Sequence, residues 1–374
     1  MGGKALKNVP TNRLSPSDFQ TLQSRLLPII STHFRKSAIP PYLPTKQSFG
    51  DLDILVAGPK SPTAHASIIS HFQSKESVSN GGVTSFEVDG FQVDLISVPE
   101  AEYEVALGYL SWGDLGAMIG MVAKKVGLKY GSKGLSLAIT SHDINESPSS
   151  SFVPQSAETP QSPSQPTPTT LTQIHLSLSH NDILTHLGFN PDIHAKGFAT
   201  QQDLFTYLTS STYFLPQSFT PTPSETNAEF RRRLQQRPTW AELATFIENT
   251  NPPPGAGVAP ELLSDDPEIR RKWRGEFRKK SVEKFGKKAE WDAVVERERL
   301  RKVVKSRVGG DVVRRITGKD GKDLGVIMKR IKQELASLGP NEMEAWRTLE
   351  RMTDEHVTSL ILKCAGQIPP QDPS

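Results

Sequence analysis

Three short segments of the first 100 residues have strand-like patterns of apolar residues, which alternate with polar ones most clearly in FQVDLISV. In two other segments apolar residues recur with helical spacing. Alternation is typical of half-buried strands, whereas a spacing of three and four residues is typical of amphipathic helices. Between the last two strand-like segments stands the dipeptide Asp89-Gly90, which favours a tight hairpin turn. We therefore predict an α/β or α+β core with helices at residues 19–34 and 64–74 and strands at residues 52–56, 83–88 and 91–98.

A stretch rich in proline, serine and threonine interrupts this pattern at residues 146–172, with the sequence ESPSSSFVPQSAETPQSPSQPTPTTLT. It contains almost no apolar residues around which to fold, so we predict a flexible, disordered insertion. The flanking sequences LSLAIT and IHLSLS both alternate in the manner of strands. The insertion is therefore interpreted as an elongated loop between two paired strands, and it need not separate domains.

Residues 173–215 carry two helical repeats of apolar residues, separated by Gly188 and Gly197. We interpret this part as a continuation of the core or as a small helical subdomain, and its aromatic residues as core rather than as a base-stacking surface. A second proline-rich break precedes residues 225–365, which have the pattern of a helical, basic domain. The expected organisation is a core at residues 1–145, the insertion, the middle segment and a C-terminal helical domain.

The 374-residue chain has a formal net charge of +3 and a single cysteine, Cys364. One cysteine excludes a disulfide framework and any cysteine-based metal site, which fits an intracellular compartment, nuclear or cytoplasmic. No apolar run reaches the length that a bilayer-spanning helix needs, so we expect a soluble protein without a membrane partner. Lysine and arginine concentrate in the C-terminal third, and this asymmetry indicates a polyanionic partner such as a nucleic acid. The oligomeric state stays open.

Two aspartates, Asp51 and Asp53, stand at the start of an apolar strand in the sequence QSFGDLDILV. Residues two apart on a strand point to the same side, about 6.5 Å apart along it, so both carboxylates can hold one ligand. A third carboxylate, Asp94, lies in the apolar sequence FQVDLISV, where a lone aspartate carries a large desolvation cost unless it is paired or metal-bound. Asp51 alone would be interpreted as a turn or cap residue, but the three together predict a two-metal site. Carboxylate oxygens select Mg²⁺ or Mn²⁺, and two such ions support phosphoryl or nucleotidyl transfer.

The aspartate motifs also resemble those of a known superfamily. GDLDILV followed by VDLISV resembles the paired-aspartate and third-aspartate motifs of the polymerase beta-like nucleotidyltransferase superfamily. The stretch PEAEYEVALGYLSWGDLGAMIGMVAKKVGLKYGSKGL is similar to the segment after the third aspartate in family X DNA polymerases and their relatives. The resemblance covers about residues 30–140, and it implies a nucleotidyltransferase catalytic core built on a mixed β-sheet with flanking helices.

The resemblance further implies roles for individual residues. Asp51 and Asp53 would bind both metals, and Asp94 would bind the catalytic metal and help to deprotonate the attacking hydroxyl. The donor would be a nucleoside triphosphate and the cofactor Mg²⁺ or Mn²⁺. The nucleotide-binding residues that the resemblance implies in this sequence are Ser37, Gly50, Ser111 and Gly113.

Two features depart from the superfamily pattern. Its members place a Gly-Ser doublet before the aspartates, where backbone amides and the hydroxyl hold the triphosphate. Here Lys36-Ser37 stands in that place, and a lysine cannot offer the close backbone approach of glycine. The helix after SWGD has Ala117 and Met121 where template-directed polymerases present polar or basic groups. These departures favour untemplated transfer, and they leave two alternatives: an inactive nucleic-acid-binding scaffold and a family X-like DNA repair polymerase.

The basic sequence RRKWRGEFRKK at residues 270–280 can neutralise the backbone phosphates of a nucleic acid, RNA being favoured over DNA. Within it, Trp273 and Phe277 stand four residues apart. They can present a stacking pair to bases, but inward packing beside a solvated charged face is the favoured interpretation. The nucleic-acid-binding residues that we expect are Arg271, Lys272, Arg274, Arg278, Lys279 and Lys280.

Other candidate chemistry is weaker. Gly321, Leu324 and Gly325 faintly resemble the beginning of a C-terminal helix in tRNA nucleotidyltransferases, although any glycine-bearing loop before a helix has this pattern. The nine histidines show no H-E-x-x-H or paired metal spacing, so His186 and His194 are interpreted as structural. The sequence therefore predicts a metal-dependent nucleotidyltransferase that transfers a nucleoside monophosphate to a hydroxyl of a nucleic-acid acceptor.

Overall fold

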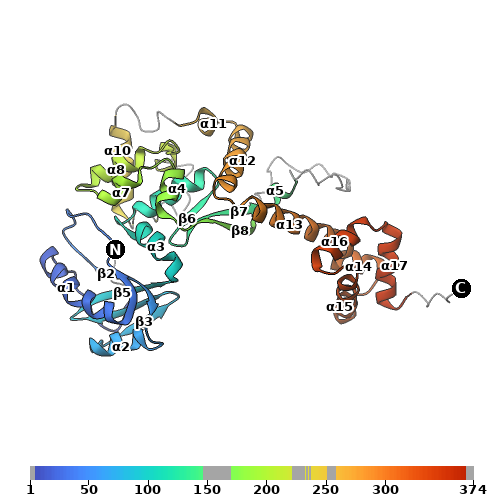
Figure 1. Cartoon of the computed structure of the whole chain (residues 1–374), viewed down its shortest axis with the longest axis horizontal. Helices are drawn as coiled ribbons and strands as arrows, with labels where there is room; N and C mark the ends of the chain where they lie inside the picture. The colour runs from blue at the N-terminus through green and yellow to red at the C-terminus, as the bar shows by residue number, and fades with distance from the viewer. Residues whose placement is uncertain are drawn as a thin grey trace. The chain divides into compact units, whose positions relative to one another are not determined.

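A computed structural model describes most of the chain (Figure 1). The described residues are 5–145, 170–220, 237–250 and 258–367, together with Arg232 and Gln235. They divide into a first unit from Met1–Leu137 and His175–Phe285 and a second unit from Ala138–Ile174 and Gly286–Ser374. Most of the expected insertion lies outside the described residues, so its flexibility stays a prediction.

Five strands form a mixed sheet in the first unit, in the order β1-β2-β5-β4-β3. Strands β2 and β5 are parallel, and the other neighbouring pairs are antiparallel. The expected α+β class is confirmed, and β2, β4 and β5 are the three strands that the sequence pattern predicts. The short edge strands β1 and β3 escape such a prediction, because polar residues dominate both and only pairing defines them. The bounds are Phe34–Ala38 for β1, Asp51–Pro59 for β2, Ser77–Asn80 for β3, Val83–Val88 for β4 and Phe91–Val98 for β5.

A tight turn at Asp89-Gly90 joins β4 to β5, as the sequence predicts. Asp89 and Gly90 both have left-handed backbone angles, with φ of 51° and 74°. Positive φ at both central residues is characteristic of the hairpin turn whose twist matches that of the strands. The turn fixes a register in which Val88 pairs with Phe91 and Ser85 with Asp94.

Helices cover the two faces of this sheet with different groups. On one face, Leu52, Ile54 and Val56 of β2 are fully buried in a cluster with residues of α1 and α2. On the other face, Leu55 and Ala57 pack against α3. The bounds are Pro16–His33 for α1, Ala64–His71 for α2 and Tyr103–Leu110 for α3, which follows a 3₁₀ turn at Glu100–Glu102.

A second, three-stranded sheet has the order β6-β7-β8. Strands β7 and β8 are neighbours and flank the insertion, which confirms that the insertion connects two adjacent strands. Helix α4 precedes the sheet, and the short helix α5 follows β7. The bounds are Leu115–Lys125 for α4, Lys129–Gly131 for β6, Gly134–Thr140 for β7, Ser141–Asn145 for α5 and Thr170–Ser177 for β8.

Helices after β8 complete the first unit around an aromatic core. Phe198, Phe205, Tyr207 and Phe214 are all at most 5% exposed, so the prediction that these aromatics form core is confirmed. The bounds are His180–His186 for α6, Pro191–Lys196 for α7, Gln201–Thr209 for α8, Pro216–Ser218 for a 3₁₀ turn, Pro238–Asn249 for α10, Pro260–Leu263 for α11 and Pro267–Lys284 for α12.

Helix α12 is anchored to α6 by a buried contact. The side chains of His186 and Ser281 lie 2.8 Å apart, and the ring of His186 stacks on Phe277. The Ser281 hydroxyl donates to the carbonyl of Phe277 at 2.7 Å, so it accepts from His186 Nε2. Contacts of this kind explain why the compact first unit extends to Phe285 and includes α10–α12, although composition groups these helices with the C-terminal region.

The second unit contains a bundle of helices with its own core. Val313, Ile331, Leu349 and Ile361 are at most 1% exposed within it. Arg299 is buried between carboxylates and pairs with Glu296 on its own helix and Glu350 on α16. The bounds are Lys288–Val308 for α13, Gly310–Thr317 for α14, Gly321–Ser337 for α15, Glu342–Arg351 for α16 and Asp354–Ala365 for α17.

Within the described part of the chain, no individual helix is both long enough and apolar enough to cross a membrane. The segments Glu100–Leu110 and Leu115–Lys125 satisfy the length and composition criteria only as a pair, and a 100° bend separates them.

We predict that His186 makes the fold sensitive to acid. Burial, with a contribution from Lys284, lowers the pKa of His186 to about 4, below the ordinary value of 6.5. Its neutral form therefore contributes stability that is complete above pH 6.5 and is lost as the pH falls from 6.5 to about 4. When the pH is lowered from 7 to 4.5, the melting temperature of His186→Gln should fall by less than that of the wild type. The exposed His71→Gln is the control, and an equal decline in all three proteins would contradict the prediction.

Candidate metal centre

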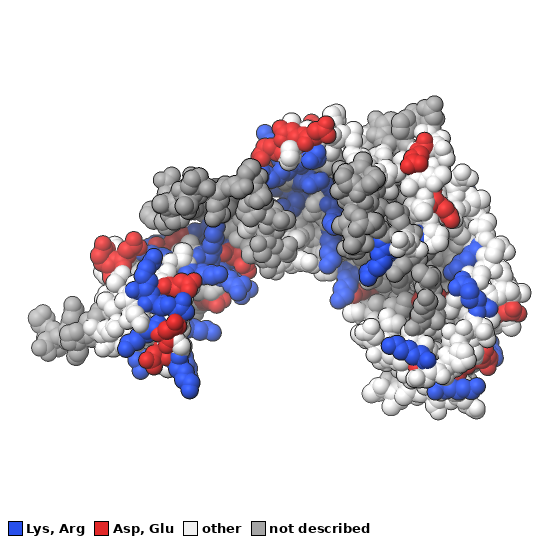
Figure 2. All heavy atoms as spheres, turned by 180° about the vertical axis from the view of Figure 1, so that it is seen from behind, with Lys and Arg blue, Asp and Glu red and all other residues white. Residues whose placement is uncertain are grey.

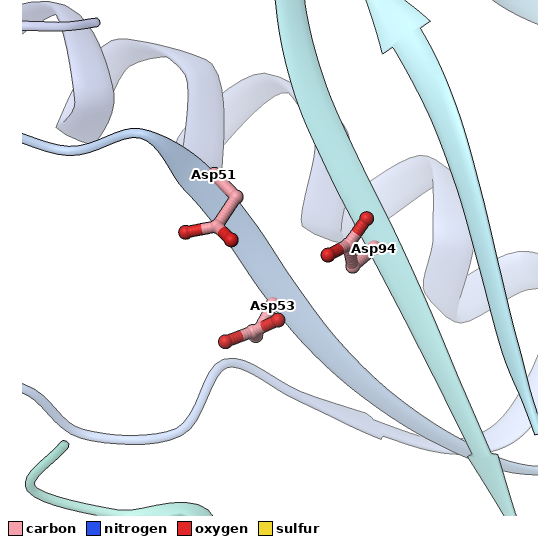
Figure 3. Close-up of side chains that lie close together, drawn as sticks. All are labelled: Asp51, Asp53 and Asp94. Carbon is pink, nitrogen blue, oxygen red and sulfur yellow. The ribbon is translucent and has the colours of Figure 1, made fainter. Parts of the chain in front are cut away.

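The structure brings the three predicted aspartates together on one face of the mixed sheet. Asp51 and Asp53 lie on β2, and Asp94 lies on the neighbouring strand β5, directly opposite Asp53 in the parallel register. Each offers a carboxylate oxygen, and these three oxygens all lie within 4.8 Å of one another. Figure 3 shows the three side chains on the same side of the two strands.

The alternation of β2 and β5 explains why this acidic cluster is accessible. Asp51, Asp53, Leu55 and Ala57 share one face of β2, because residues two apart point the same way. Helix α3 covers the apolar second half of this face, where it packs on Leu55 and Ala57. The aspartates occupy the first half. Asp51 is half-buried and Asp53 exposed, so the cluster is open to a ligand from solvent.

The pKa of Asp53 is raised by burial and by the two neighbouring carboxylates. Asp53 keeps a solvent-accessible edge, yet the protein around it removes much of its hydration. This desolvation, reinforced by the charges of Asp51 and Asp94 and opposed by Lys46, raises the pKa of Asp53 to about 7. Without a cation, the fold therefore disfavours full ionisation of the cluster.

Asp94 is held by two neighbours that hydrogen-bond its carboxylate. The side-chain amide of the buried Gln92 donates to both oxygens of Asp94, at 2.9 and 3.1 Å. Gln92 is itself oriented by the backbone N–H of Ala5, which donates to its side-chain oxygen at 2.9 Å. Desolvation raises the pKa of Asp94, while hydrogen bonds from Ser85 and Gln92 work against that shift. Asp94 is thus fixed in position, and on balance its pKa is raised because desolvation outweighs the two hydrogen bonds.

Lys46 is a cation placed beside the cluster by the loop between β1 and β2. Its ammonium lies 4.6 Å from the ring centroid of Phe49, and Phe49 stands two residues before Asp51. Burial lowers the pKa of Lys46, while attraction to Asp51 and Asp53 opposes the shift. Arg13 also contacts this loop. Its guanidinium donates to the hydroxyl of Ser48 at 2.8 Å and to the backbone carbonyl of Ser48 at 2.9 Å.

The donor set of this cluster fits a hard divalent cation. Three carboxylates from two rigid, paired strands supply oxygen ligands, which Mg²⁺ and Mn²⁺ prefer. A bound cation would offset the repulsion among the carboxylates, which adds to desolvation in raising the pKa of Asp53. The arrangement is therefore compatible with a metal site.

The structure does not bring Ser37 to the aspartates. In the β1–β2 pairing Ser37 lies opposite Val56, whose side chain is buried on the α1 side of the sheet. The hydroxyl of Ser37 lies 2.8 Å from that of Ser31 in α1. Its neighbour Lys36 pairs with Glu104 at 2.8 Å. Lys36 and Ser37, which stand where the resemblance would place a Gly-Ser doublet, thus have other partners.

The other three nucleotide-binding candidates lie in two loops. Gly50 is buried immediately before Asp51. Ser111 ends α3 and donates to the carbonyl of Leu107 at 2.6 Å, while Gly113 has a left-handed φ of 69°. Between them Trp112 is also left-handed, with φ of 65°, which is unusual for a bulky residue. The backbone N–H of Trp112 donates to the carbonyl of Pro41 at 2.6 Å, which ties this turn to the loop after β1.

Ser111 and Trp112 line a cavity of about 590 Å³ in the first unit. His180 and His194 also line this cavity, and their rings are in edge-to-face contact. His180 also bonds to the hydroxyl of Tyr130 at 3.0 Å. Burial lowers the pKa of both histidines to about 4, so they are neutral at physiological pH.

The six basic residues expected to bind nucleic acid all lie on α12, but they differ in what they contact. Arg271 pairs with Glu268, and Lys279 pairs with Glu276 at 3.2 Å. Lys272 and Lys280 are exposed, whereas Arg274 and Arg278 are half-buried. Trp273 and Phe277 stack on each other with centroids 5.3 Å apart, and Phe277 is only 8% exposed. Phe277 therefore packs inward, as the favoured interpretation predicts.

Sequence reasoning missed the residues that support the aspartates. Gln92 stands two residues before Asp94, a spacing that places both on one face of a strand, so the pattern contained this information. Ser85 requires the hairpin register, which the Asp89-Gly90 turn fixes. Lys46 has no local pattern that would have identified it, because a loop residue reaches its site only through the fold.

Comparisons with protein-family models and with curated proteins find no match for this chain. The case for function consequently rests on the aspartate geometry and on the resemblance of the motifs.

We predict that Asp53 is a source of instability in the metal-free protein. The pKa of Asp53 is raised from 3.8 to about 7. Between these pH values the folded protein binds the proton of Asp53 more tightly than the unfolded chain does, so the free energy of unfolding falls as the pH rises through this window. At pH 8 and without divalent ions, Asp53→Asn should raise the melting temperature by roughly 2–4 °C for each kcal/mol of relieved repulsion. Mg²⁺ should stabilise the wild type but not Asp53→Asn in differential scanning fluorimetry.

The matched control is Asp89→Asn, an exposed turn aspartate that pairs with Arg25. It should keep the Mg²⁺ response of the wild type. Equal stabilisation of the wild type and Asp53→Asn by Mg²⁺ would exclude Asp53 as a metal ligand.

Proposed function

We propose that this protein is a metal-dependent nucleotidyltransferase. It transfers a nucleoside monophosphate from a nucleoside triphosphate to a hydroxyl group of a nucleic-acid acceptor, RNA being favoured over DNA, without a template. The observation that carries the proposal is the convergence of Asp51, Asp53 and Asp94 from two parallel strands to within 4.8 Å. The motif resemblance supports the same reaction class.

The reaction is an exchange of phosphoryl bonds. The acceptor hydroxyl oxygen forms a bond to the α-phosphorus, the bond from that phosphorus to the bridging oxygen breaks, and pyrophosphate leaves with the bonding electrons. When bound, one or two Mg²⁺ ions would stabilise the negative charge that develops on the attacking and leaving oxygens. Asp51 and Asp53, two apart on β2, would hold these ions.

Asp94 is the residue best placed to receive the proton of the attacking hydroxyl. Its carboxylate is anchored by Gln92 through both oxygens, which leaves the remaining lone pairs in a fixed direction. Desolvation raises the pKa of Asp94, and a higher pKa makes its carboxylate a stronger base than a solvated aspartate. Positioning by Gln92 thus supports a role in both metal binding and proton transfer.

Lys46 offers this site a cation that could replace the missing Gly-Ser doublet. A triphosphate carries several negative charges, so a site without backbone amides from that doublet needs another source of positive charge. The β1–β2 loop supplies Lys46, which is attracted to Asp51 and Asp53 on β2, while Asp94 lies on the neighbouring strand β5. We assign the donor triphosphate to the Lys46 side and the acceptor hydroxyl to the Asp94 side.

Helix α4 supports untemplated rather than templated transfer. Ala117 and Met121 are partly exposed on one face of α4, since they stand four residues apart. Neither side chain can form the polar contacts through which a polymerase checks a nascent base pair. This favours a terminal transferase over a family X-like repair polymerase.

One observation favours a second candidate, an inactive scaffold that binds nucleic acid. The hydroxyl of Ser37 is directed to Ser31 on the far face of the sheet, so the residue that aligns with the triphosphate-binding serine has no access to the aspartates. The scaffold differs from the enzyme in predicting salt-sensitive nucleic-acid binding without Mg²⁺-dependent turnover.

The wild type should extend a primer, and the aspartate variants should not. Each labelled ribonucleoside and deoxyribonucleoside triphosphate is offered with short RNA and DNA primers and Mg²⁺ or Mn²⁺. Asp51→Ala and Asp94→Ala should lower extension by at least about 10³-fold, since the metals contribute several kcal/mol to the barrier. Asp89→Ala serves as the control. Absence of extension by folded wild type that binds RNA would favour the scaffold, and products that follow an annealed template would favour the polymerase.

Removal of Lys46 should weaken binding of the donor. We expect Lys46→Ala to raise the KM for the nucleoside triphosphate about 5–30-fold, the effect of losing about 1–2 kcal/mol of binding, with a smaller change in kcat. The exposed Lys75→Ala should leave both constants unchanged. A decrease in kcat at constant KM would contradict a triphosphate-binding role for Lys46.

A further inference from the structure

Helix α12 places arginines on the face that it buries. Its buried residues are Phe277, Ser281 and Val282. Arg274 stands three, seven and eight residues before them, and these spacings put it on the same face of the helix. An amphipathic helix normally has an apolar residue at such a position, so the arginine at 274 calls for a physical explanation.

Among the residues that the structure describes, Arg274 has no partner that would offset its charge. It is half-buried, it makes no hydrogen bond or ion pair with any residue that the structure describes, and its Nε is fully enclosed without an acceptor. Its charged neighbour is Arg270, one turn earlier, which repels it. Desolvation and this repulsion lower the pKa of Arg274. A half-buried guanidinium without an anion is costly, because its lost hydration is not replaced.

The surroundings of Arg274 add positive charge. Arg270 donates to the carbonyl of Ser264, which holds its guanidinium at the first turn of α12. One turn after Arg274, the side chain of Arg278 packs on Gly127, so that a Cβ at Gly127 would lie 2.9 Å from Arg278 Cδ. Gly127 follows α4, whose last turn carries two lysines. Figure 2 shows Lys and Arg side chains gathered in a band on the first unit, whereas they are interspersed with Asp and Glu on the second.

We propose that Arg270 and Arg274 form a binding site for a backbone phosphate of the nucleic-acid acceptor. This inference rests on the proposed function only for the choice of a nucleic acid as the source of the phosphate. A guanidinium matches phosphate with parallel hydrogen bonds, and two arginines one turn apart can hold one phosphate group between them. A phosphate would supply the negative charge that no described residue places beside Arg274.

The contacts within α12 indicate which of its basic residues bind the phosphate. Arg271 and Lys279 already pair with Glu268 and Glu276, so a phosphate gains less from them. Stacking on bases is not part of this site, since Trp273 and Phe277 stack on each other. The site therefore recognises the backbone and carries no base preference.

The test measures binding without catalysis. Fluorescence anisotropy of a labelled single-stranded RNA is recorded over a range of salt concentrations without divalent ions. The proteins are full-length chains carrying Asp51→Ala and Asp94→Ala, so failure of nucleotidyl transfer does not affect the result. Adding Arg274→Gln should weaken binding about 3–10-fold at 100 mM salt and reduce the slope of log K against log salt by about 0.7–1, the loss of one phosphate contact. Arg270→Gln should have a similar effect.

Two matched controls lie on the same helix. Arg271→Gln and Lys279→Gln remove equal charge from paired positions, and they should change affinity and slope less than Arg274→Gln does. Equal losses for all four variants would show a diffuse basic surface and overturn the site. Arg274→Lys keeps the charge without the planar fork and should recover only part of the affinity, whereas full recovery would overturn the bidentate geometry.

A second arm separates a strand phosphate from a free anion. Inorganic phosphate and ATP are compared with chloride at matched ionic strength for their effect on the melting temperature of the wild type and Arg274→Gln. RNA binding that depends on Arg274 supports the proposal. Stabilisation by free phosphate or ATP that depends on Arg274, with RNA binding unchanged by the substitution, would overturn the assignment to a nucleic-acid strand. The melting temperature of Arg274→Gln also verifies that the variant is folded.

Discussion

The parallel pairing of β2 with β5 is the constraint on which the candidate site depends. It sets Asp53 opposite Asp94, and with Asp51 it brings three like charges within metal-ligand distance. No local preference would assemble these carboxylates, because each repels the others and loses hydration in the fold. The lost hydration and this repulsion together raise the pKa of Asp53. Hydrophobic burial on the opposite face, by Leu52 and Ile54 among others, holds the strands in place despite the repulsion.

Elements around the sheet convert this pairing into an open and oriented site. The tight turn before β5 fixes the register, and α3 covers the apolar half of the acidic face while leaving the aspartates accessible. Gln92 then orients Asp94, and the β1–β2 loop brings Lys46 to the edge of the cluster. Each support uses a different physical device, respectively backbone conformation, apolar packing, hydrogen bonding and charge.

The basic residues of α12 also have to be distinguished by the groups that they contact. A count of basic residues treats Arg271, Arg274 and Lys279 as equivalent, yet two of them are neutralised by acids on their own helix. Arg274 differs because it lies on the buried face of the helix and pairs with no acid in the described part of the chain. Exposed ion pairs contribute little to stability, whereas a desolvated cation without a partner has much to gain from a ligand. The proposed contact with nucleic acid therefore depends on burial more than on the number of charges.

The sequence alone determined the features that depend on short spacings. Strand-like apolar patterns predicted β2, β4 and β5, the spacing of Asp51 and Asp53 placed both on one face, and Asp89-Gly90 specified the hairpin turn. Tertiary structure decided the rest. The direction of Ser37, away from the aspartates, follows from the pairing of a short polar edge strand, and the position of Lys46 follows from the path of a loop. Contacts between residues distant in sequence fix these features, because local periodicity carries no information on which face or partner a distant segment will meet.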